Sequence, residues 1–246
     1  MLVRYDVSSI DQRRSYSNLE PPSKGGTMRV LVACEESQRV ANEFRKLGHE
    51  AYSCDLIESS GGHDEIHIKT DALQLLKMKW DLVIAHPPCT YLACSGNRWF
   101  NEEKYGEKAR ERKRLREEAA QFFMCFIECD SPHIAVENPI GYMSTVYRKP
   151  DQIIQPYEFG DTERKATCLW LKGLRPLKAT NVVDQSLVML GNGKTHSKWE
   201  IESLNMRAKE RAKFRSKTFP GIAKAMAIQW CEQIGTEGIK SYEYYE

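Results

Sequence analysis

The sequence predicts a doubly wound α/β fold with a mostly parallel sheet and a small basic second lobe. Short apolar runs alternate with helical patterns along most of the chain, as expected when helices cover both faces of a parallel sheet. With 246 residues, 41% of them hydrophobic, the chain suits a globular domain rather than a disordered one. Residues 161–217 hold 13 lysines and arginines against 6 acidic residues. This segment predicts the basic lobe and makes a polyanion a candidate partner, with a solvated basic surface as the alternative.

Two kinds of local pattern predict the elements of this fold. Apolar runs rich in valine, leucine and isoleucine predict strands at 29–33, 50–54, 66–68, 81–85, 133–136 and 167–171. Apolar residues at helical spacing predict helices at 37–47, 72–77, 104–127 and 221–234. Ser37 and Asp71 are candidate N-caps of the first two helices, and Gly48 stands where a C-terminal glycine belongs.

The first 27 residues are polar and contain Pro21-Pro22 and Gly25-Gly26, so we expect residues 1–27 to form a flexible N-terminal arm. No apolar run approaches the length of a membrane span, and the first residues lack the apolar core of a secretory signal. We therefore expect a cytoplasmic protein with no membrane partner, whose eight cysteines are reduced thiols. The cysteine and histidine spacings lack CxxC-type pairs, so we expect no metal site.

Ligands of doubly wound sheets collect at the carboxyl ends of the strands, so the residues after each strand are the candidate site. Cys34-Glu35-Glu36-Ser37 follows the first predicted strand, Asp55 the second and Asp71 the third. A carboxylate about twenty residues beyond the first turn suits a pair of ribose hydroxyls. Aspartates at strand ends also cap turns and helices, so both interpretations stay open.

Two sites fixed by proline follow the fourth and fifth strands. The first is His86-Pro87-Pro88-Cys89, and the second is Glu137-Asn138-Pro139. Because proline fixes the backbone, it holds its neighbours rigidly at the sheet edge. A cysteine near a helix start is a candidate nucleophile, and a carboxyl at an apolar strand end is a candidate proton donor. Adjacent parallel strands would bring Cys89 and Glu137 close together.

The order of these features resembles the cytosine-C5 DNA methyltransferase family: a strand–turn–helix unit, then Pro-Pro-Cys at 87–89, then Glu-Asn-Pro at 137–139, then a basic strand. The resemblance covers about residues 28–230 without 172–214. The segments TCLWLKGL and RSKTFPGIAKAMA are similar to compact, phage-type members. The resemblance implies a Rossmann-like fold, S-adenosylmethionine as the methyl donor, and double-stranded DNA with a flipped cytosine as the substrate.

The resemblance also implies roles for individual residues. Cys89 would be the nucleophile that adds to C6 of the cytosine, which makes C5 reactive toward a methyl sulfonium. Glu137 would hold N3 and the exocyclic amine. Arg164 or Lys165, just before the sixth predicted strand, would orient the base through its O2.

Cofactor residues are implied near several strand ends and near the C-terminus. Ser37 and the amides of the helix that follows it would bind the methionine carboxylate, Asp55 the ribose and Asp71 the adenine amine. The full implied set is Glu35, Ser37, Asp55, Asp71, Pro87, Thr218, Phe219 and Gly221. The family's glycine-bearing turn is replaced here by Ala-Cys-Glu-Glu-Ser-Gln at 33–38, a departure that bears on cofactor affinity more than on cofactor identity.

The implied domain organisation is a catalytic domain at 28–171 and 215–246 and a target-recognition segment at 172–214. Because this segment is short, we expect recognition of a very short DNA motif or relaxed sequence preference. We expect a monomer acting in the cytoplasm of a bacterial or phage-infected cell. The alternatives are the same chemistry on RNA or on a free cytosine nucleotide, and a non-catalytic nucleic-acid-binding relative. Arg98 and Trp99 lie in a stretch that either closes over the base or packs within the fold.

Overall fold

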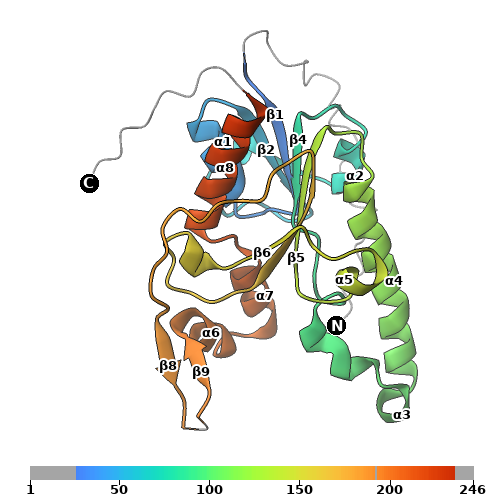
Figure 1. Ribbon diagram of the computed structural model, residues 1–246. Helices are drawn as coiled ribbons and strands as arrows, with labels where there is room; N and C mark the ends of the chain where they lie inside the picture. The colour runs from blue at the N-terminus through green and yellow to red at the C-terminus, as the bar shows by residue number, and fades with distance from the viewer. Residues whose placement is uncertain (1–25, 192, 236–246) are drawn as a thin grey trace.

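The computed structural model describes residues 26–191 and 193–235 and contains a seven-stranded sheet (Figure 1). Its strands are β1 (Arg29–Ala33), β2 (Glu50–Asp55), β3 (His67–Lys69), β4 (Leu82–Ala85), β5 (His133–Pro139), β6 (Gln152–Ile154) and β7 (Thr167–Lys172). The strand order is β3-β2-β1-β4-β5-β7-β6. Strand β7 runs antiparallel to both of its neighbours, and the other pairings are parallel. The predicted doubly wound, mostly parallel fold is confirmed.

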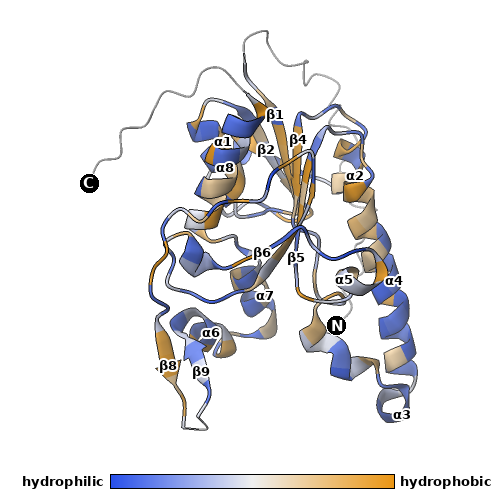
Figure 2. Ribbon diagram, viewed as in Figure 1, coloured by the Kyte–Doolittle hydropathy of each residue, from blue (hydrophilic) through white to orange (hydrophobic). Residues whose placement is uncertain are grey.

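Helices cover both faces of the sheet. On one side lie α1 (Arg39–Lys46) and α8 (Pro220–Ile234), and on the other lie α2 (Ala72–Leu75) and α4 (Glu107–Ile127) (Figure 1). Strand β1 serves both cores, since successive strand side chains point to opposite faces. Val30 and Val32 join the core beneath α1 and α8, whereas Leu31 joins the core beneath α4. Accordingly, β1 and β4 are hydrophobic along their length between the two helical layers (Figure 2).

Shorter elements connect and extend this sheet. They are the 3₁₀ helices η3 (Asp64–Ile66), η4 (Cys94–Phe100) and η5 (Pro156–Glu158), the helices α3 (Glu102–Tyr105) and α5 (Met143–Val146), the hairpin β8 (Leu187–Met189) and β9 (Thr195–Ser197), and the helices α6 (Lys198–Leu204) and α7 (Ala208–Ser216). The hairpin, α6 and α7 gather beyond the sheet at the bottom left of Figure 1 and form the small basic lobe. None of the helices in the described residues is long and apolar enough to cross a membrane.

Several predicted boundaries are wrong for local reasons. The predicted helix at 104–127 is divided between α3 and α4, because Gly106 adopts a positive φ of 51°. The first helix begins at Arg39, so Ser37 is not its N-cap; Gln38 takes that position with a φ of 57° and no side-chain cap. Gly48 follows α1 with a φ of 87°, as a C-terminal glycine does.

The sheet positions a site at the point where the strand order reverses. Neighbours β1 and β4 run in parallel, and the chain leaves them toward opposite halves of the sheet. In open α/β sheets, ligands bind in the crevice outside the carboxyl ends of such a strand pair. The residues that follow β1, β4 and β5 are therefore the ones to compare. The predicted division into an arm, a catalytic domain and a recognition segment stays a prediction, and residues 1–25 of the arm lie outside the described residues.

Candidate active site

The first residue after β4 meets the last part of β5 at this edge of the sheet. Because Ala85 is paired with Val136 in parallel register, His86 lies level with Glu137. The predicted strand end at 136 is wrong, since β5 continues through Glu137 to Pro139, where it pairs with β7. Nδ1 of His86 lies 3.0 Å from Oε2 of Glu137, and the two side chains are only 6% and 13% exposed. The amide of His86 donates to the carbonyl of Ala33 at 3.0 Å, which ties this pair to the end of β1.

Two loops hold Cys89 in a fixed place relative to Glu137. The amides of Leu92 and Ala93 both donate to the carbonyl of Cys89, at 3.0 and 2.9 Å, and close a tight turn around it. The buried side chain of Asn138, next to Glu137, donates to the carbonyl of Pro87 at 2.8 Å. The loop after β4 is therefore bonded directly to the end of β5.

A second set of contacts joins the same two loops farther out. The amide of Cys94 donates to Ile140 at 3.1 Å, and the amide of Tyr142 donates to Leu92 at 2.8 Å. Gly141 lies between them, and a Cβ at this position would be 2.0 Å from the carbonyl oxygen of Leu92. Only glycine permits the two backbones to approach this closely.

The charges around Cys89 and Glu137 oppose one another. Burial raises the pKa of Glu137, but the positive charge of Lys165 and the hydrogen bond from His86 outweigh burial and bring this pKa below its usual value. Residue Cys89 is exposed, yet protein atoms crowd its sulfur. This partial burial raises the pKa of the thiol, the charge of Glu137 raises it further, and Lys165 and Arg215 lower it. The thiol, the carboxylate and the lysine therefore act on one another as a single electrostatic cluster.

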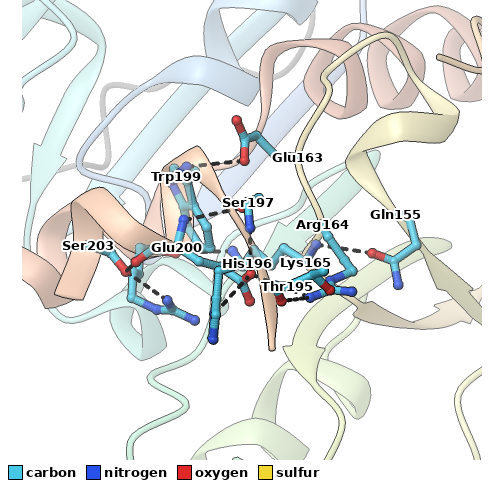
Figure 3. A network of polar contacts seen from close by, with 11 residues as sticks. Gln155, Glu163, Arg164, Lys165, Thr195, His196, Ser197, Trp199, Glu200 and Ser203 are labelled. Atoms are coloured by element: carbon cyan, nitrogen blue, oxygen red, sulfur yellow. Dashed lines mark hydrogen bonds and ion pairs between the residues drawn. The ribbon is translucent and has the colours of Figure 1, made fainter. Parts of the chain in front are cut away.

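The two basic residues predicted beside the base lie in different directions (Figure 3). Lys165 belongs to the cluster through its charge, and its Nζ donates to the carbonyl of Arg215 at 3.1 Å. Arg164 turns toward the basic lobe, where it donates to the carbonyl of Thr195 at 2.9 Å and lies 3.7 Å from Glu200. The structure thus brings Lys165, and not Arg164, together with Cys89 and Glu137.

The side chain of Glu35 binds backbone amides at the start of α1. Its carboxylate accepts from the amides of Val40 and Ala41, at 2.6 and 3.2 Å, and thereby caps the helix in place of Ser37. Two amides of the expected anion site at this helix end are therefore already bonded. Burial raises the pKa of Glu35 to about 7, despite the nearby charge of His86 and these two hydrogen bonds, which lower it. The side chain of Ser37 is buried beside it.

Asp55 and Asp71 lie close together after β2 and β3. Burial raises the pKa of the Cys34 thiol, and the charges of both aspartates raise it further, so the three residues share one region. Oδ1 of Asp55 accepts from the amides of Leu56 and Ile57, at 2.7 and 3.3 Å. Asp71 caps α2 by accepting from the amide of Leu73 at 3.0 Å, which confirms the predicted cap.

Of the remaining predicted cofactor residues, Pro87 lies in the loop after β4, and Thr218, Phe219 and Gly221 lie where α7 leads into α8. The carbonyl of Thr218 accepts from Arg39 at 2.8 Å, and the ring of Phe219 lies 5.4 Å from that of Trp199. The amide of Gly221 donates to Asp161 at 2.9 Å, and a Cβ here would be 1.9 Å from the carbonyl oxygen of Phe159. Gly221 is therefore needed for the close packing of α8 on η5.

Sequence reasoning named no role for two buried polar residues at this edge. Nε2 of His86 has no hydrogen-bond partner among the described residues, and neither carboxylate oxygen of Glu36 has one. Both residues are adjacent to predicted site residues, at the carboxyl ends of β4 and β1. Their position at the point of strand reversal was the available signal.

Arg98 and Trp99 lie outside this cluster, on η4. Trp99 is 42% exposed, and the guanidinium of Arg98 lies 4.7 Å from the centre of its ring. The ring is therefore not part of the core, which leaves it accessible to a substrate. Within 26–191 and 193–235, no three histidine, cysteine or acidic residues gather closely enough to hold a metal ion.

No protein-family profile matches this chain, and no curated protein sequence matches it. Among solved structures, it is similar to one assigned as a DNA modification methyltransferase encoded within an E. coli prophage, with 14% identity and a TM-score of 0.37 over 59% of this chain and 46% of that one. It is also similar to the Entamoeba histolytica methyltransferase EhMeth, with 12% identity and a TM-score of 0.38 over 65% of this chain and 58% of that one. The matches thus span about half the length of those proteins, and similarity this low assigns no activity to this chain.

Proposed function

We propose that this protein transfers a methyl group from S-adenosylmethionine to C5 of cytosine in DNA, through a covalent bond between Cys89 and C6 of the base. The observation that carries the proposal is the cluster of Cys89, Glu137, His86 and Lys165 at one sheet edge. A thiol and a carboxylate that interact electrostatically, on backbone fixed by proline, suit the addition of the thiol to a cytosine ring that must be protonated at the same time.

Cys89 and Glu137 have complementary tasks in this reaction. Sγ of Cys89 forms a bond to C6, and N3 takes up a proton, so the ring becomes an enamine with a nucleophilic C5. Because the pKa of Glu137 is lowered, its carboxylate is ionised before the base enters, so this proton comes from water and is then held between N3 and Glu137. S-adenosylmethionine, when bound, would supply the electrophilic methyl carbon for C5 and would leave as the thioether S-adenosylhomocysteine. Loss of the C5 proton to water, expulsion of the Cys89 thiolate and release of the proton from N3 then give neutral 5-methylcytosine.

The electrostatics of the cluster couple the two tasks. The negative charge of Glu137 raises the pKa of Cys89, so neutralising Glu137 favours the thiolate. Lys165 and Arg215 stabilise that thiolate through their positive charges. His86, hydrogen-bonded to Oε2 of Glu137, fixes which carboxylate oxygen faces the base.

The chain's own residues fit a cofactor at the ends of β1 and β2. Both described hydrogen bonds to Asp55 use Oδ1, so its second oxygen can take a ribose hydroxyl. The carboxylate of Glu36 is buried without a hydrogen-bond partner, as expected of a group that binds a ligand. A Cβ at Gly61 would lie 2.4 Å from Oε1 of Gln38, so this loop is packed closely against the turn after β1.

The basic lobe supplies the contacts to DNA in this proposal. Arg175 and Lys178 lie early in the 172–214 segment. Their backbone amides donate hydrogen bonds to the side chains of Gln233 and Gln229 of α8, so both residues belong to the body of the domain. The hairpin projects farther and presents exposed apolar side chains such as Met189, which is 73% exposed. So small a projecting surface fits a very short recognition motif.

The test is nucleoside mass spectrometry on DNA from cells that express the wild type, Cys89→Ala or Cys94→Ala. Cys94 is the matched control, because it is also exposed and lies in the same loop. We expect 5-methylcytosine in DNA with the wild type and Cys94→Ala, and none with Cys89→Ala. Methylation that persists in Cys89→Ala would refute the nucleophile. If the wild type leaves the DNA unchanged but methylates tRNA or dCMP with labelled S-adenosylmethionine, DNA is the wrong substrate.

A further inference from the structure

Glu36 is a buried carboxylate whose negative charge has few hydrogen-bond donors or cations around it. It is 5% exposed, and neither of its oxygens accepts a hydrogen bond among the described residues. Burying a carboxylate without partners is costly, so such a group usually has a cationic or hydrogen-bond-donating partner. The cation beside it is Lys213, with Nζ at 3.5 Å from Oε2 and a side chain that is 45% exposed. This distance is long for a charge-assisted hydrogen bond, which leaves Glu36 poorly compensated.

The surroundings of Glu36 favour a positively charged ligand. Burial raises the pKa of both Glu35 and Asp55, and the charge of Glu36 raises each further, so these carboxylates are close to one another. The backbone fixes Glu36 in this place: Cys34 and Gln38, on either side, both adopt positive φ, of 59° and 57°. Non-glycine residues in that region are strained, and such strain clusters at binding sites.

The parts of S-adenosylmethionine differ in what they can offer a carboxylate. The ribose offers hydroxyls, for which Asp55 is placed, whereas the methionine part carries an α-ammonium with three N–H donors and a positive charge. Resting on the proposed function, we infer that Glu36 binds the α-ammonium of the cofactor, in competition with the ammonium of Lys213. The ammonium of the cofactor then compensates the buried charge of Glu36, and no additional cation is needed to do so.

The competition connects the cofactor site to the basic lobe. Lys213 belongs to α7, and Arg215, two residues farther along that helix, accepts at its carbonyl from Lys165 of the catalytic cluster. A ligand that binds Glu36 must lower the occupancy of the Lys213 contact, because the same carboxylate serves both. By linkage, removal of Lys213 must strengthen the binding of that ligand.

The test uses the full chain and two nucleosides that differ in the group at issue. S-adenosylhomocysteine carries the α-ammonium and the carboxylate of the cofactor, and 5′-methylthioadenosine carries neither. Dissociation constants are measured by titration calorimetry for the wild type, Glu36→Gln and Lys213→Met. Glu43→Gln and Lys209→Met are the matched controls: Glu43→Gln removes a carboxylate from α1, the helix that follows Glu36, and Lys209→Met removes a lysine elsewhere on α7. Thermal denaturation of each variant verifies that it is folded.

We expect Glu36→Gln to weaken S-adenosylhomocysteine binding about 10- to 100-fold, the effect of losing one charge-assisted hydrogen bond, with 5′-methylthioadenosine binding unchanged. We expect Lys213→Met to tighten S-adenosylhomocysteine binding severalfold, and the controls to change neither constant. An equal loss for both nucleosides in Glu36→Gln, no loss, or weaker S-adenosylhomocysteine binding in Lys213→Met would overturn this inference alone. If the wild type binds neither nucleoside, the proposed cofactor and this inference fail together.

Discussion

Replacement of Gly141 by alanine tests whether the contact between the two proline-fixed loops positions the candidate active site. The new Cβ would lie 2.0 Å from the carbonyl oxygen of Leu92, whereas ordinary contact begins at 3.4 Å, so the loops must separate by more than 1 Å. That separation breaks or strains the hydrogen bonds from Cys94 to Ile140 and from Tyr142 to Leu92. Each such bond contributes about 1 kcal/mol, so we expect a loss of about 2 kcal/mol in the free energy of unfolding.

The expected loss corresponds to a fall of about 4–8 °C in the Tm of a chain of this size. A displacement of about 1 Å at the reacting groups also predicts a methyl-transfer rate about 100-fold lower at a temperature where the variant stays folded. The assays are thermal denaturation by circular dichroism and transfer of labelled methyl groups to DNA. Gly191→Ala is the control, because it has open space within 4 Å and lacks a positive φ. If Gly141→Ala has the same Tm as that control, the close approach of the two loops does not contribute to stability. If the Tm falls but the methyl-transfer rate is unchanged, the contact between the loops does not position the reacting groups.

Three further substitutions give expected outcomes. The folded-state pKa of Glu35 is raised from 4.5 to about 7, so its contribution to stability is present below pH 4.5 and is lost as the pH rises through 7. Urea unfolding should therefore show wild-type stability falling by roughly 3 kcal/mol over this interval relative to Glu35→Gln, and parallel pH profiles would contradict the assignment. Glu137→Gln should slow methyl transfer by at least about 100-fold while speeding alkylation of Cys89 at neutral pH, because the charge that raises the pKa of the thiol is gone; peptide mapping of the alkylated thiol measures this, and slower alkylation would argue against the coupling. Trp170→Ala should cost about 3–5 kcal/mol, because the side chain is fully buried against Phe123, and a loss below about 1 kcal/mol in urea unfolding would show that the core refills the cavity.

The positions of the parallel strands along the chain could be predicted because each strand and the helix after it carry their own pattern. Strand β1 is entirely buried, and after Arg29 it is a continuous apolar run of four residues, as is typical of parallel strands. The antiparallel direction of β7 could not be predicted in the same way, because direction depends on which neighbour a strand pairs with. The missed strand β6 has only three residues, too few for a periodic signal.

In the candidate site too, features that follow from local sequence could be predicted, and features that depend on backbone conformation or packing could not. Cys89 and Glu137 could be placed together because Cys89 follows β4, Glu137 lies in the last part of β5, and the carboxyl ends of neighbouring parallel strands lie at one sheet edge. Glu35 could not be recognised as the cap of α1, because Ser37 is the better N-cap residue by type, and the left-handed conformation of Gln38 decides the start of the helix. Arg164 and Lys165 are adjacent in the sequence, and only the packing of the basic lobe separates their directions.

The contacts of the basic lobe are the ones that are hardest to predict from the sequence. Its residues reach back to sites that precede it by long stretches of chain: Lys213 to Glu36, Lys217 to Ser60, and the carbonyl of Arg215 to Lys165. Each contact is a polar one made by a lysine ammonium, so none produces a hydrophobic pattern. If α7 carries DNA contacts as proposed, the same helix responds to DNA, to the cofactor carboxylate and to the catalytic lysine. A rise in salt concentration should therefore weaken S-adenosylhomocysteine binding by Lys213→Met more than by the wild type, since in the wild type screening weakens both the ligand's contact with Glu36 and the competing contact of Lys213.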